Sequence, residues 1–366
     1  MCGLWPRDRL NDRSTGPVHG ETLLTTILVS AAGAPGTAAL VRALRENGER
    51  EVRVVGTDMA ERSVGRFLCD AFHRVPAGSD PRFGDAMLDV ARREDVDAIL
   101  PQSSFDLLGL AEAKDHFEGV AVMVSSPDAV RRSNDKAESY ALLDEIGVPG
   151  PRWRRVVGGA AVAEAAGELG YPGEDVALKP AFSSGSRGFR ILSAEADRRE
   201  QLLKNRPGVA EALRLEELVE LLGGDETPLL VMELASGLER TIDGIAEGGQ
   251  IALGHAKTRE SMRAGLAMYF ATLDDEWLME ISAKIVEALS LDHFFNIQLV
   301  GDKVIEINPR ISTIVYQEDL NLPWLGVKHA LGEISGEELA AHRDRVRPTR
   351  RALRYFDQVE WDEPFA

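Results

Sequence analysis

The sequence is poor in cysteine, in positive charge and in long apolar runs. Two cysteines among 366 residues are too few for a disulfide framework or a zinc cluster. The 42 basic residues are outnumbered by 60 acidic ones, and the formal charge of −18 argues against sequence-blind binding of nucleic acid. The longest apolar runs, such as 26–32, have the length of a strand, so we expect no membrane-spanning helix.

The remaining composition is that of an ordinary globular protein. Apolar residues make up 44% of the chain and charged residues 28%, which excludes a disordered or collagenous chain, and the length fits two or three domains. Residues 1–22 are polar without an apolar core, so we expect a flexible extension that is not a signal peptide. With so few cysteines, we expect a reducing, cytoplasmic location.

From residue 23 the sequence alternates between strand and helix patterns. We expect strands at 25–30, 51–57, 97–101 and 120–125, and helices at 38–47, 81–93 and 107–117. This alternation predicts a parallel sheet with helical crossovers over 23–128. Gly33 and Gly36 form a tight turn after the first strand, but the third glycine of a dinucleotide-binding fingerprint is missing.

Residues 129–340 form a second region of mixed structure. We expect helices at 137–146, 160–169, 195–224 and 276–289, and strands at 152–157, 189–192, 229–233, 239–245, 294–300 and 303–308. We divide this region into a lobe of about 152–232 and a C-terminal lobe of about 233–340, followed by a C-terminal segment, 341–366. The six arginines from Arg343 to Arg354 are expected on a solvated face or a subunit contact.

A loop of small residues follows the strand that contains Lys179. Its members are Ser183, Ser184, Gly185, Ser186, Arg187 and Gly188. Small side chains let backbone N–H groups approach an anion, and Lys179 adds a positive charge beside them. The loop is not a P-loop, because it has no Gly-Lys-Ser/Thr motif and continues into a strand. A plain hairpin tip with a surface lysine is the alternative.

The expected strand at 303–308 presents polar residues on one face. Glu306 and Asn308 are two residues apart and point to the same side, whereas the neighbouring isoleucines point into the core. Carboxylate and amide oxygens suit a hard cation such as Mg²⁺, and Arg310 suits a phosphate or a carboxylate. An exposed sheet face is the alternative.

The turn of this hairpin decides whether Gln298 joins the same face. A plain two-residue turn at Gly301 and Asp302 would place Gln298 on the face opposite to Glu306. We therefore predict a three-residue turn or a bulge at 300–303, which returns Gln298 to the side of Glu306.

The order of these motifs resembles that of the ATP-grasp superfamily. The order is Asn-Asp-Lys at 134–136, Lys179 with its glycine loop, Glu233, Glu239, Gln298 and the run Glu-Ile-Asn-Pro-Arg at 306–310. The resemblance is greatest to the carbamoyl-phosphate-synthase large-subunit type and to related amino-acid ligases, and it covers about 23–330. It implies an α/β and α+β fold, in which a parallel-sheet pre-ATP-grasp domain precedes a two-lobed ATP-grasp domain.

The resemblance also implies where a nucleotide binds. Lys136 and Lys179 look like the lysines that hold the α- and β-phosphates of ATP, and loop 183–188 looks like the flap that closes over them. Glu233, with the backbone of Leu234, looks like the hinge that reads adenine. The ribose-binding carboxylate would be Glu239.

The same resemblance implies metal ligands and anion-binding residues. The ligands of two Mg²⁺ ions, which Mn²⁺ can replace, would be Gln298, Glu306 and Asn308. Arg310 looks like the group that faces the transferred phosphoryl or the substrate carboxylate. Arg259 and Arg263 lie in a stretch rich in cations, where similar proteins place an arginine near the γ-phosphate; a solvated loop is the alternative.

The implied activity is that of an ATP-dependent ligase. It would join a small-molecule carboxylate to an amine through an acylphosphate, releasing ADP and phosphate, without nucleic-acid or membrane partners; relatives are often homodimers. Carbamoyl-phosphate synthases carry two copies of this unit, a second arginine after Asn-Pro-Arg, and mostly glycines where Arg187 stands. These differences favour a carboxylate other than bicarbonate. A bicarbonate-activating enzyme and a catalytically silent ATP-binding protein are the alternatives.

Overall fold

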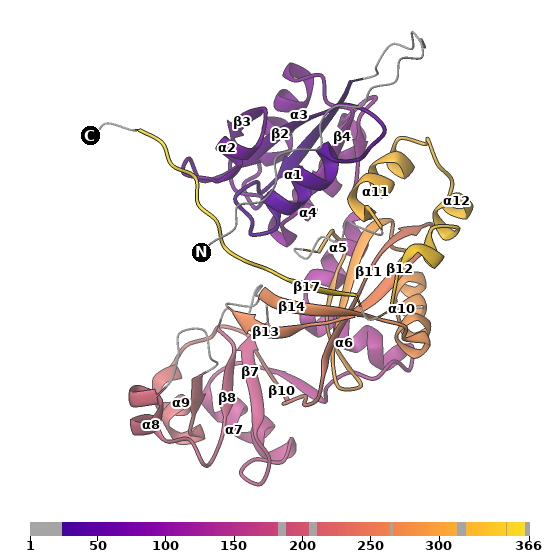
Figure 1. Cartoon of the computed structure of the whole chain (residues 1–366). Coiled ribbons are helices and arrows are strands. Elements are labelled where there is room, and N and C mark those ends of the chain that lie inside the picture. Colours follow the sequence, from indigo (N-terminus) through magenta and orange to yellow (C-terminus); the bar gives the residue numbers. More distant parts are fainter. Residues whose placement is uncertain are drawn as a thin grey trace, which may run out of the picture.

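The protein is built around three β-sheets that follow one another along the chain (Figure 1). The computed structural model describes residues 24–181, 188–204, 211–263, 266–312, 320–348 and 350–362. Among these residues no helix has the length and apolar character that crossing a membrane requires. The predicted combination of a parallel-sheet domain with later mixed lobes is confirmed, while the expected extension 1–22 lies outside the described residues.

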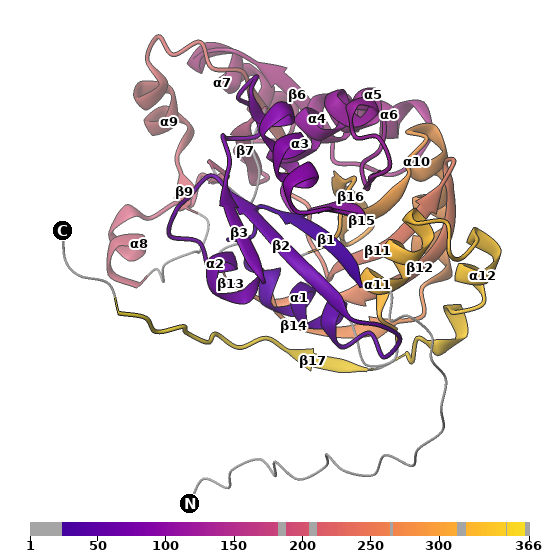
Figure 2. The same cartoon turned by 90° about the horizontal axis from the view of Figure 1, so that it is seen from above.

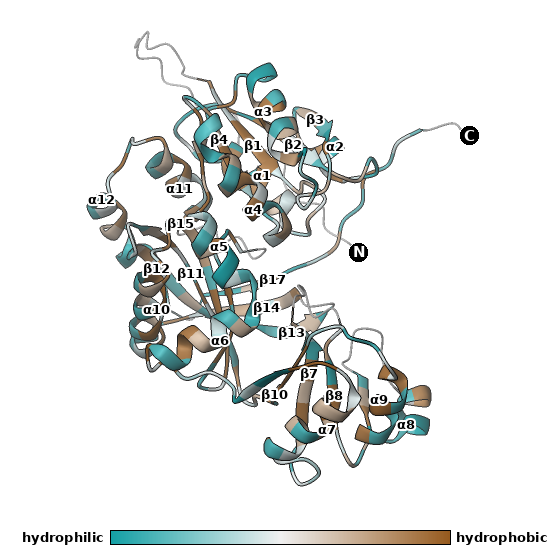
Figure 3. Ribbon diagram, turned by 180° about the vertical axis from the view of Figure 1, so that it is seen from behind, coloured by the Kyte–Doolittle hydropathy of each residue, from teal (hydrophilic) through white to brown (hydrophobic). Residues whose placement is uncertain are grey.

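The N-terminal sheet is parallel and has the strand order β3-β2-β1-β4-β5. Its strands are β1 Thr25–Ser30, β2 Val52–Asp58, β3 Ala71–Arg74, β4 Ala98–Pro101 and β5 Ala121–Val122. Its helices are α1 Thr37–Arg45, α2 Gly65–Leu68, α3 Phe83–Arg93, α4 Ser104–Ala113 and the 3₁₀ turn η1 Lys114–His116. Helix α1 covers one face, where Ile27 and Val29 point, and α3 and α4 cover the other, where Leu28 points (Figure 2). Strand β1 is therefore buried throughout and hydrophobic, whereas α3 carries both kinds of residue (Figure 3).

The second sheet is mixed and has the order β6-β10-β7-β8-β9. Helices α5 Pro127–Asn134 and α6 Lys136–Glu145 lead into it. Its strands are β6 Trp153–Val156, β7 Val176–Pro180, β8 Arg190–Leu192, β9 Glu211–Leu213 and β10 Leu229–Glu233, with helices α7 Gly159–Glu168, α8 Arg198–Lys204 and α9 Leu215–Leu222. The continuous helix expected over 195–224 is wrong, because β9 interrupts it. That three-residue strand pairs with β8 in parallel. It is too short for its sequence to show the alternation of polar and apolar residues that indicates a strand.

The third sheet is antiparallel, in the order β13-β14-β12-β11-β15-β16, and β17 pairs with β14. Its strands are β11 Glu239–Glu247, β12 Gln250–Thr258, β13 Glu260–Arg263, β14 Leu266–Leu273, β15 His293–Val300, β16 Lys303–Asn308 and β17 Arg351–Leu353. The helices of this region are α10 Glu276–Ala288, α11 Leu322–Ala330, α12 Gly336–Ala340 and the 3₁₀ turn η2 Arg343–Arg345. One face of the sheet is apolar and packs on α10 through residues such as Ile242 and Ile297.

Helix α11 joins the third sheet to the N-terminal domain. Trp324 and Leu325 belong to one hydrophobic core that also contains Ile27 of β1, Leu44 of α1 and Phe294 of β15. Just before the helix, Asn321 donates a side-chain hydrogen bond to the carbonyl oxygen of Ala43 at 2.7 Å. The two parts therefore share a continuous core, which fixes the N-terminal domain against the third sheet.

The hairpin of β15 and β16 contains the predicted irregularity, two pairs away from the predicted place. Val300 pairs with Lys303, so the turn itself has two residues. The register shifts next to Gln298, which pairs with Glu306 and leaves Ile305 as the additional residue of β16. Because the bulge shifts the register by one residue, Gln298 lies on the same face of the sheet as Glu306.

Gly244 lies in close contact with neighbouring residues at the centre of the third sheet. A Cβ atom added there would lie 2.4 Å from the carbonyl oxygen of Leu253 and 2.5 Å from the ring of Phe295. Gly244→Ala should therefore lower the free energy of unfolding by about 1–3 kcal/mol in a denaturant titration. Gly167→Ala is the matched control, because nothing lies within 4 Å of its added Cβ on α7. Equal stability of the two variants would contradict this packing.

Candidate active site

A row of polar side chains crosses the third sheet on the face turned away from α10. Glu306 pairs with Gln298, Gln298 with Thr241, and Thr241 with Lys257. Paired residues of antiparallel strands point to the same side, so the row runs over β16, β15, β11 and β12. Thr241 and Lys257 are buried, which places polar groups inside the molecule instead of on a solvated surface. The alternative of an exposed sheet face is therefore wrong for this part of the row.

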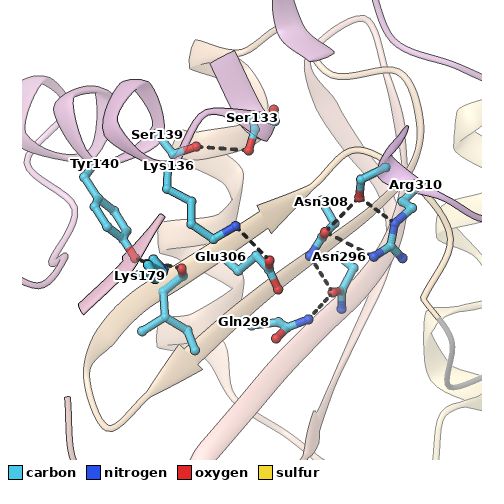
Figure 4. Close-up of polar contacts among 12 residues, drawn as sticks. Ser133, Lys136, Ser139, Tyr140, Lys179, Asn296, Gln298, Glu306, Asn308 and Arg310 are labelled. Carbon is cyan, nitrogen blue, oxygen red and sulfur yellow. Dashed lines mark hydrogen bonds and ion pairs between the residues drawn. The ribbon is translucent and has the colours of Figure 1, made fainter. Parts of the chain in front are cut away.

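Side-chain amides connect this row to the next residues along the strands. Gln298 Nε2 and Asn308 Nδ2 both donate to Asn296 Oδ1, at 2.9 and 3.3 Å (Figure 4). Asn296 Nδ2 in turn donates to Asp243 Oδ1 at 2.8 Å. This network holds the amide groups around Glu306 in defined orientations.

Two lysines from other parts of the chain approach Glu306. Lys136, the first residue of α6, places Nζ 3.3 Å from Glu306 Oε1 (Figure 4). Lys179 on β7 donates to the hydroxyl of Tyr140 at 3.2 Å and lies 5.4 Å from the centre of its ring. The same hydroxyl donates at 3.0 Å to the carbonyl oxygen of Ile305, which is the additional residue of the bulge. The lysine of β7 is thereby tied to the hairpin of β16.

The charges of this cluster shift one another's proton affinities. Burial, together with the charge of Lys136, lowers the pKa of Lys179 to about 7 from 10.5, and Glu306 opposes the change only in part. Burial acts to raise the pKa of Glu306, but Lys136, Arg310 and Lys179 together hold it below its ordinary value. Glu306 is therefore ionised at neutral pH, while Lys179 is close to half protonated.

Arg310 lies where the N-terminal domain meets the third sheet. Its Nε donates to Ser104 Oγ of α4 at 3.0 Å, and a terminal nitrogen donates to Asn308 Oδ1 at 3.2 Å. The carbonyl oxygen of Ser104 accepts a hydrogen bond from Asn134 Nδ2 at 3.0 Å. Sequence reasoning missed Ser104, because its contact depends on how the two domains pack together.

Asp243 and Lys257 form a buried ion pair that the sequence reasoning did not propose. Burial lowers the pKa of Lys257, and Asp243 opposes that shift. His255, which pairs with Asp243 across the strands, has its pKa lowered to about 4 by burial and by the charge of Lys257. The signal in the sequence was the placement of His255, Lys257 and Arg259 at every second position, which is typical of a strand with one polar face.

The structure separates the two arginines expected near the γ-phosphate. Arg259 is buried, continues the polar face of β12, and donates from Nε to Glu239 Oε1 at 2.6 Å. The solvated-loop alternative is therefore wrong for Arg259. Arg263 is exposed on β13, and its guanidinium lies 4.8 Å from the ring centre of Phe356. It is not brought to the polar row.

The residues expected at the nucleotide base and in the flap lie at the second sheet. Glu233 ends β10, with Oε1 3.1 Å from Lys303 Nζ, so it bridges the second and third sheets. Leu234 is half-buried against the core below the third sheet. Gly188 has a φ of +71° and lies so close to Pro180 that an added Cβ would come within 2.7 Å of it. The other flap residues, Ser183 to Arg187, lie outside the described residues.

The donor set of the row fits a hard divalent cation that is shared with phosphates. The oxygen donors are one ionised carboxylate, from Glu306, and the amides Gln298 and Asn308. Within the part of the chain that the structure describes, no three acidic, histidine or cysteine side chains gather at one point. Mg²⁺ is commonly held by one or two carboxylates together with substrate phosphates, so the residues present fit that arrangement.

Two parts of the chain match known protein families. Residues 225–352 match the family described as "ATP-grasp in the biosynthetic pathway with Ter operon", and residues 27–125 match the PylC-like N-terminal domain. Residues 225–352 are thus similar to an ATP-grasp family. The first match covers the whole polar row, and the second covers the N-terminal sheet, in agreement with the resemblance found from the motifs.

Individual relatives agree with these two family matches. The arginine-specific large chain of carbamoyl phosphate synthase from Bacillus subtilis (strain 168) is 26% identical over 254 residues, which are 64% of this chain and 22% of that relative. The chain thus spans less than a quarter of this relative's length.

Solved structures show the same fold. The N5-carboxyaminoimidazole synthetase of Staphylococcus aureus, complexed with ADP, has a TM-score of 0.62 at 13% identity and covers 86% of this chain and 80% of its own. The L-amino acid ligase of Bacillus licheniformis has a TM-score of 0.59 at 15% identity, over 89% and 78% of the two chains.

The lowered pKa of Lys179 predicts a pH-dependent cost in stability. Between pH 7 and 10.5 the unfolded chain binds a proton that the folded chain does not, so this group makes the fold more stable as pH rises. Relative to Lys179→Met, the free energy of unfolding of the wild type should fall by about 2 kcal/mol from pH 9 to pH 7. Lys284→Met, at an exposed lysine of α10, is the control that should show no such trend. A flat difference for Lys179→Met would refute the shift.

The Asp243–Lys257 pair predicts strong coupling in a double-mutant cycle. Asp243→Asn leaves a buried ammonium without its carboxylate and should cost about 3 kcal/mol of stability. Adding Lys257→Met to that variant should restore part of the loss, as judged by chemical denaturation. Additive effects of the two substitutions would show that the ion pair does not form.

Proposed function

We propose that this chain is an ATP-dependent ligase that joins a small-molecule carboxylate to an amine through an acylphosphate. The observation that carries the proposal is the cluster of Lys136, Lys179 and Glu306, which brings one partly buried lysine, one buried lysine and one carboxylate together. Phosphoryl transfer depends mainly on positioning and on charge neutralisation, and this cluster supplies both.

In this proposal the lysines bind the α- and β-phosphates of ATP. Lys179 is partly neutral at pH 7, and a phosphate placed beside it raises its proton affinity, so that the bound lysine is charged. Glu306, with Gln298 and Asn308, would hold Mg²⁺ against the phosphates. The bound ion would neutralise charge on the transferred phosphoryl group.

Arg310 and Arg259 orient the carboxylate. One carboxylate oxygen attacks the γ-phosphorus, the bond to the bridging β–γ oxygen breaks, and ADP leaves with that electron pair. The amine nitrogen then attacks the acyl carbon, the bond between this carbon and the phosphate oxygen breaks, and phosphate departs while the amine loses a proton to solvent. Arg259 also pairs with Glu239, the residue expected to bind the ribose, and so connects that carboxylate to the polar row.

The adenine would lie between the second and third sheets. Glu233 reaches the hairpin of the third sheet through Lys303, and Leu234 follows it against the apolar core. A backbone segment at such a junction can read the edge of a planar base. The flap, 183–188, would then cover the phosphates and keep water from the acylphosphate.

Bicarbonate as the activated carboxylate is a second candidate. The match to the large chain of carbamoyl phosphate synthase favours it. The missing second arginine after Arg310 favours a larger carboxylate. Bicarbonate-dependent hydrolysis of ATP distinguishes the two candidates.

The proposed activity predicts the products of a trapping assay. The full chain is incubated with ATP, Mg²⁺, hydroxylamine and a pool of amino acids and other small carboxylates, and the products are read by mass spectrometry. We expect ADP and a single dominant hydroxamate. Glu306→Gln should lower the rate at least about a hundredfold, because it removes the only charge of the metal-binding set.

Lys284→Gln is the matched control for this assay, since that lysine lies on the exposed side of α10 and should leave the rate unchanged. Release of AMP and pyrophosphate would mean adenylation and would contradict the acylphosphate. Binding of ATP without turnover of any carboxylate would instead support a silent nucleotide-binding protein.

A further inference from the structure

The C-terminal segment forms a strap between two parts of the molecule. We use this name for residues 350–362. Strand β17 adds to the outer edge of β14, and the chain then runs away from the third sheet toward α2 of the N-terminal domain (Figures 1 and 2). There the ring of Trp361 lies 4.8 Å from the ring of Phe67 on α2. The strap is thus anchored at both ends, by backbone pairing and by an aromatic contact.

The side chains of the strap alternate between solvent and the interior. Arg351, Leu353 and Tyr355 are exposed, whereas Ala352 and Arg354 are partly buried. The register pairs Ala352 with Phe270, and Ala352 packs against the first hydrophobic core. The arginines of 343–354 were expected on a solvated face or a subunit contact, and the partly buried Arg354 does not fit a solvated face.

Arg354 extends the polar row of the third sheet. Thr272 pairs with Lys257, and Phe270, two residues before it on β14, therefore lies on the same face. Lys257 Nζ lies 5.2 Å from the ring centre of Phe270. Because Ala352 pairs with Phe270, Arg354 points to the same side, and its backbone N–H donates to the carbonyl oxygen of Met268 at 2.7 Å.

Three cations consequently meet at this end of the row. Burial lowers the pKa of Arg354, and the charge of Arg259 adds to the shift. Burial likewise lowers the pKa of Lys257, to which Arg259 and Arg354 contribute. Asp243 pairs with Lys257 and Glu239 with Arg259, so these five side chains carry one net positive charge, which an anion bound beside Arg354 would offset.

The three cations and Glu306 lie at opposite ends of the polar row. Glu306 and Gln298 lie at one end of the row, and Lys257, Arg259 and Arg354 lie at the other. An anion at the second end would lie on the same sheet face as a phosphate held near Glu306. An arginine can bind a carboxylate or a phosphate through two parallel hydrogen bonds.

We propose that the strap inserts Arg354 into the active site, where it binds a small oxyanion together with Arg259 and Lys257. The inference rests on the proposed function and gives it a binding site for the carboxylate substrate or for the phosphate that leaves it. Both ligands share the chemistry of a planar or tetrahedral oxyanion. The strap thus belongs to the catalytic site, although the family match ends at residue 352.

The test measures binding of inorganic phosphate to the full chain saturated with MgADP, by isothermal titration calorimetry. Arg354→Gln should weaken phosphate binding at least about tenfold, because it removes a charge-assisted, two-pronged contact. Arg351→Gln is the matched control, since it removes the same charge from the same strand but on the exposed side. It should stay within about twofold of the wild type. The affinity for MgADP should be the same in all three proteins.

Arg354→Lys covers the case in which the glutamine variant does not fold, as judged by circular dichroism. It keeps the charge without the planar fork and should weaken phosphate binding by about threefold. Equal phosphate affinity of the wild type and the position-354 variants would overturn the proposal, as would a wild type that does not bind phosphate. This binding test needs no turnover, so it can succeed even if the trapping assay fails.

Kinetics distinguishes the two sources of the oxyanion once a carboxylate has been identified. A raised KM for the carboxylate in Arg354→Gln, with an unchanged KM for ATP, identifies the substrate as the ligand. Weaker product inhibition by phosphate, with an unchanged KM for the carboxylate, identifies the leaving phosphate. No change in either quantity would refute a role in this site.

Discussion

Attraction between the Glu306 carboxylate and two lysines joins three separate parts of the chain. Glu306 belongs to the third sheet, Lys136 begins the helix α6 that leads into the second sheet, and Lys179 lies on that sheet. Burial of Lys179, and after it repulsion from Lys136, work against this attraction and lower the pKa of Lys179 to about 7. One more negative group beside Lys179 would raise its pKa and keep it protonated at neutral pH. A bound phosphate would supply that negative charge.

The bulge in β16 gives this cluster its geometry. The additional residue, Ile305, turns Glu306 toward Gln298, and its carbonyl oxygen accepts a hydrogen bond from Tyr140. Tyr140 in turn accepts the hydrogen bond from Lys179. A single extra residue therefore both places Glu306 on the same face as Gln298 and connects that strand to the lysine of another sheet.

The sequence predicts the parts of the fold whose pattern is local. The buried strands β1 and β10 appear at their predicted bounds, because each is a short apolar run between clear ends. The prediction that an extra residue places Gln298 on the face of Glu306 is confirmed, because side chains alternate strictly along a strand. Strands β12 to β14 were not predicted, because their cation-rich stretch indicated either an anion contact or a solvated loop. Sequence alone could not place Ser104 or Arg354, whose contacts depend on packing between distant segments.

The core that α11 shares with the N-terminal domain bears on how this architecture can be rearranged in evolution. Trp324 and Leu325 belong by sequence to the later part of the chain, yet they fill space beside Ile27 and Leu44. A gene segment that encodes the N-terminal domain alone would leave that surface uncovered. Recombination between relatives would therefore have to transfer α11 along with it, so this domain and α11 form one inherited unit despite their distance in sequence.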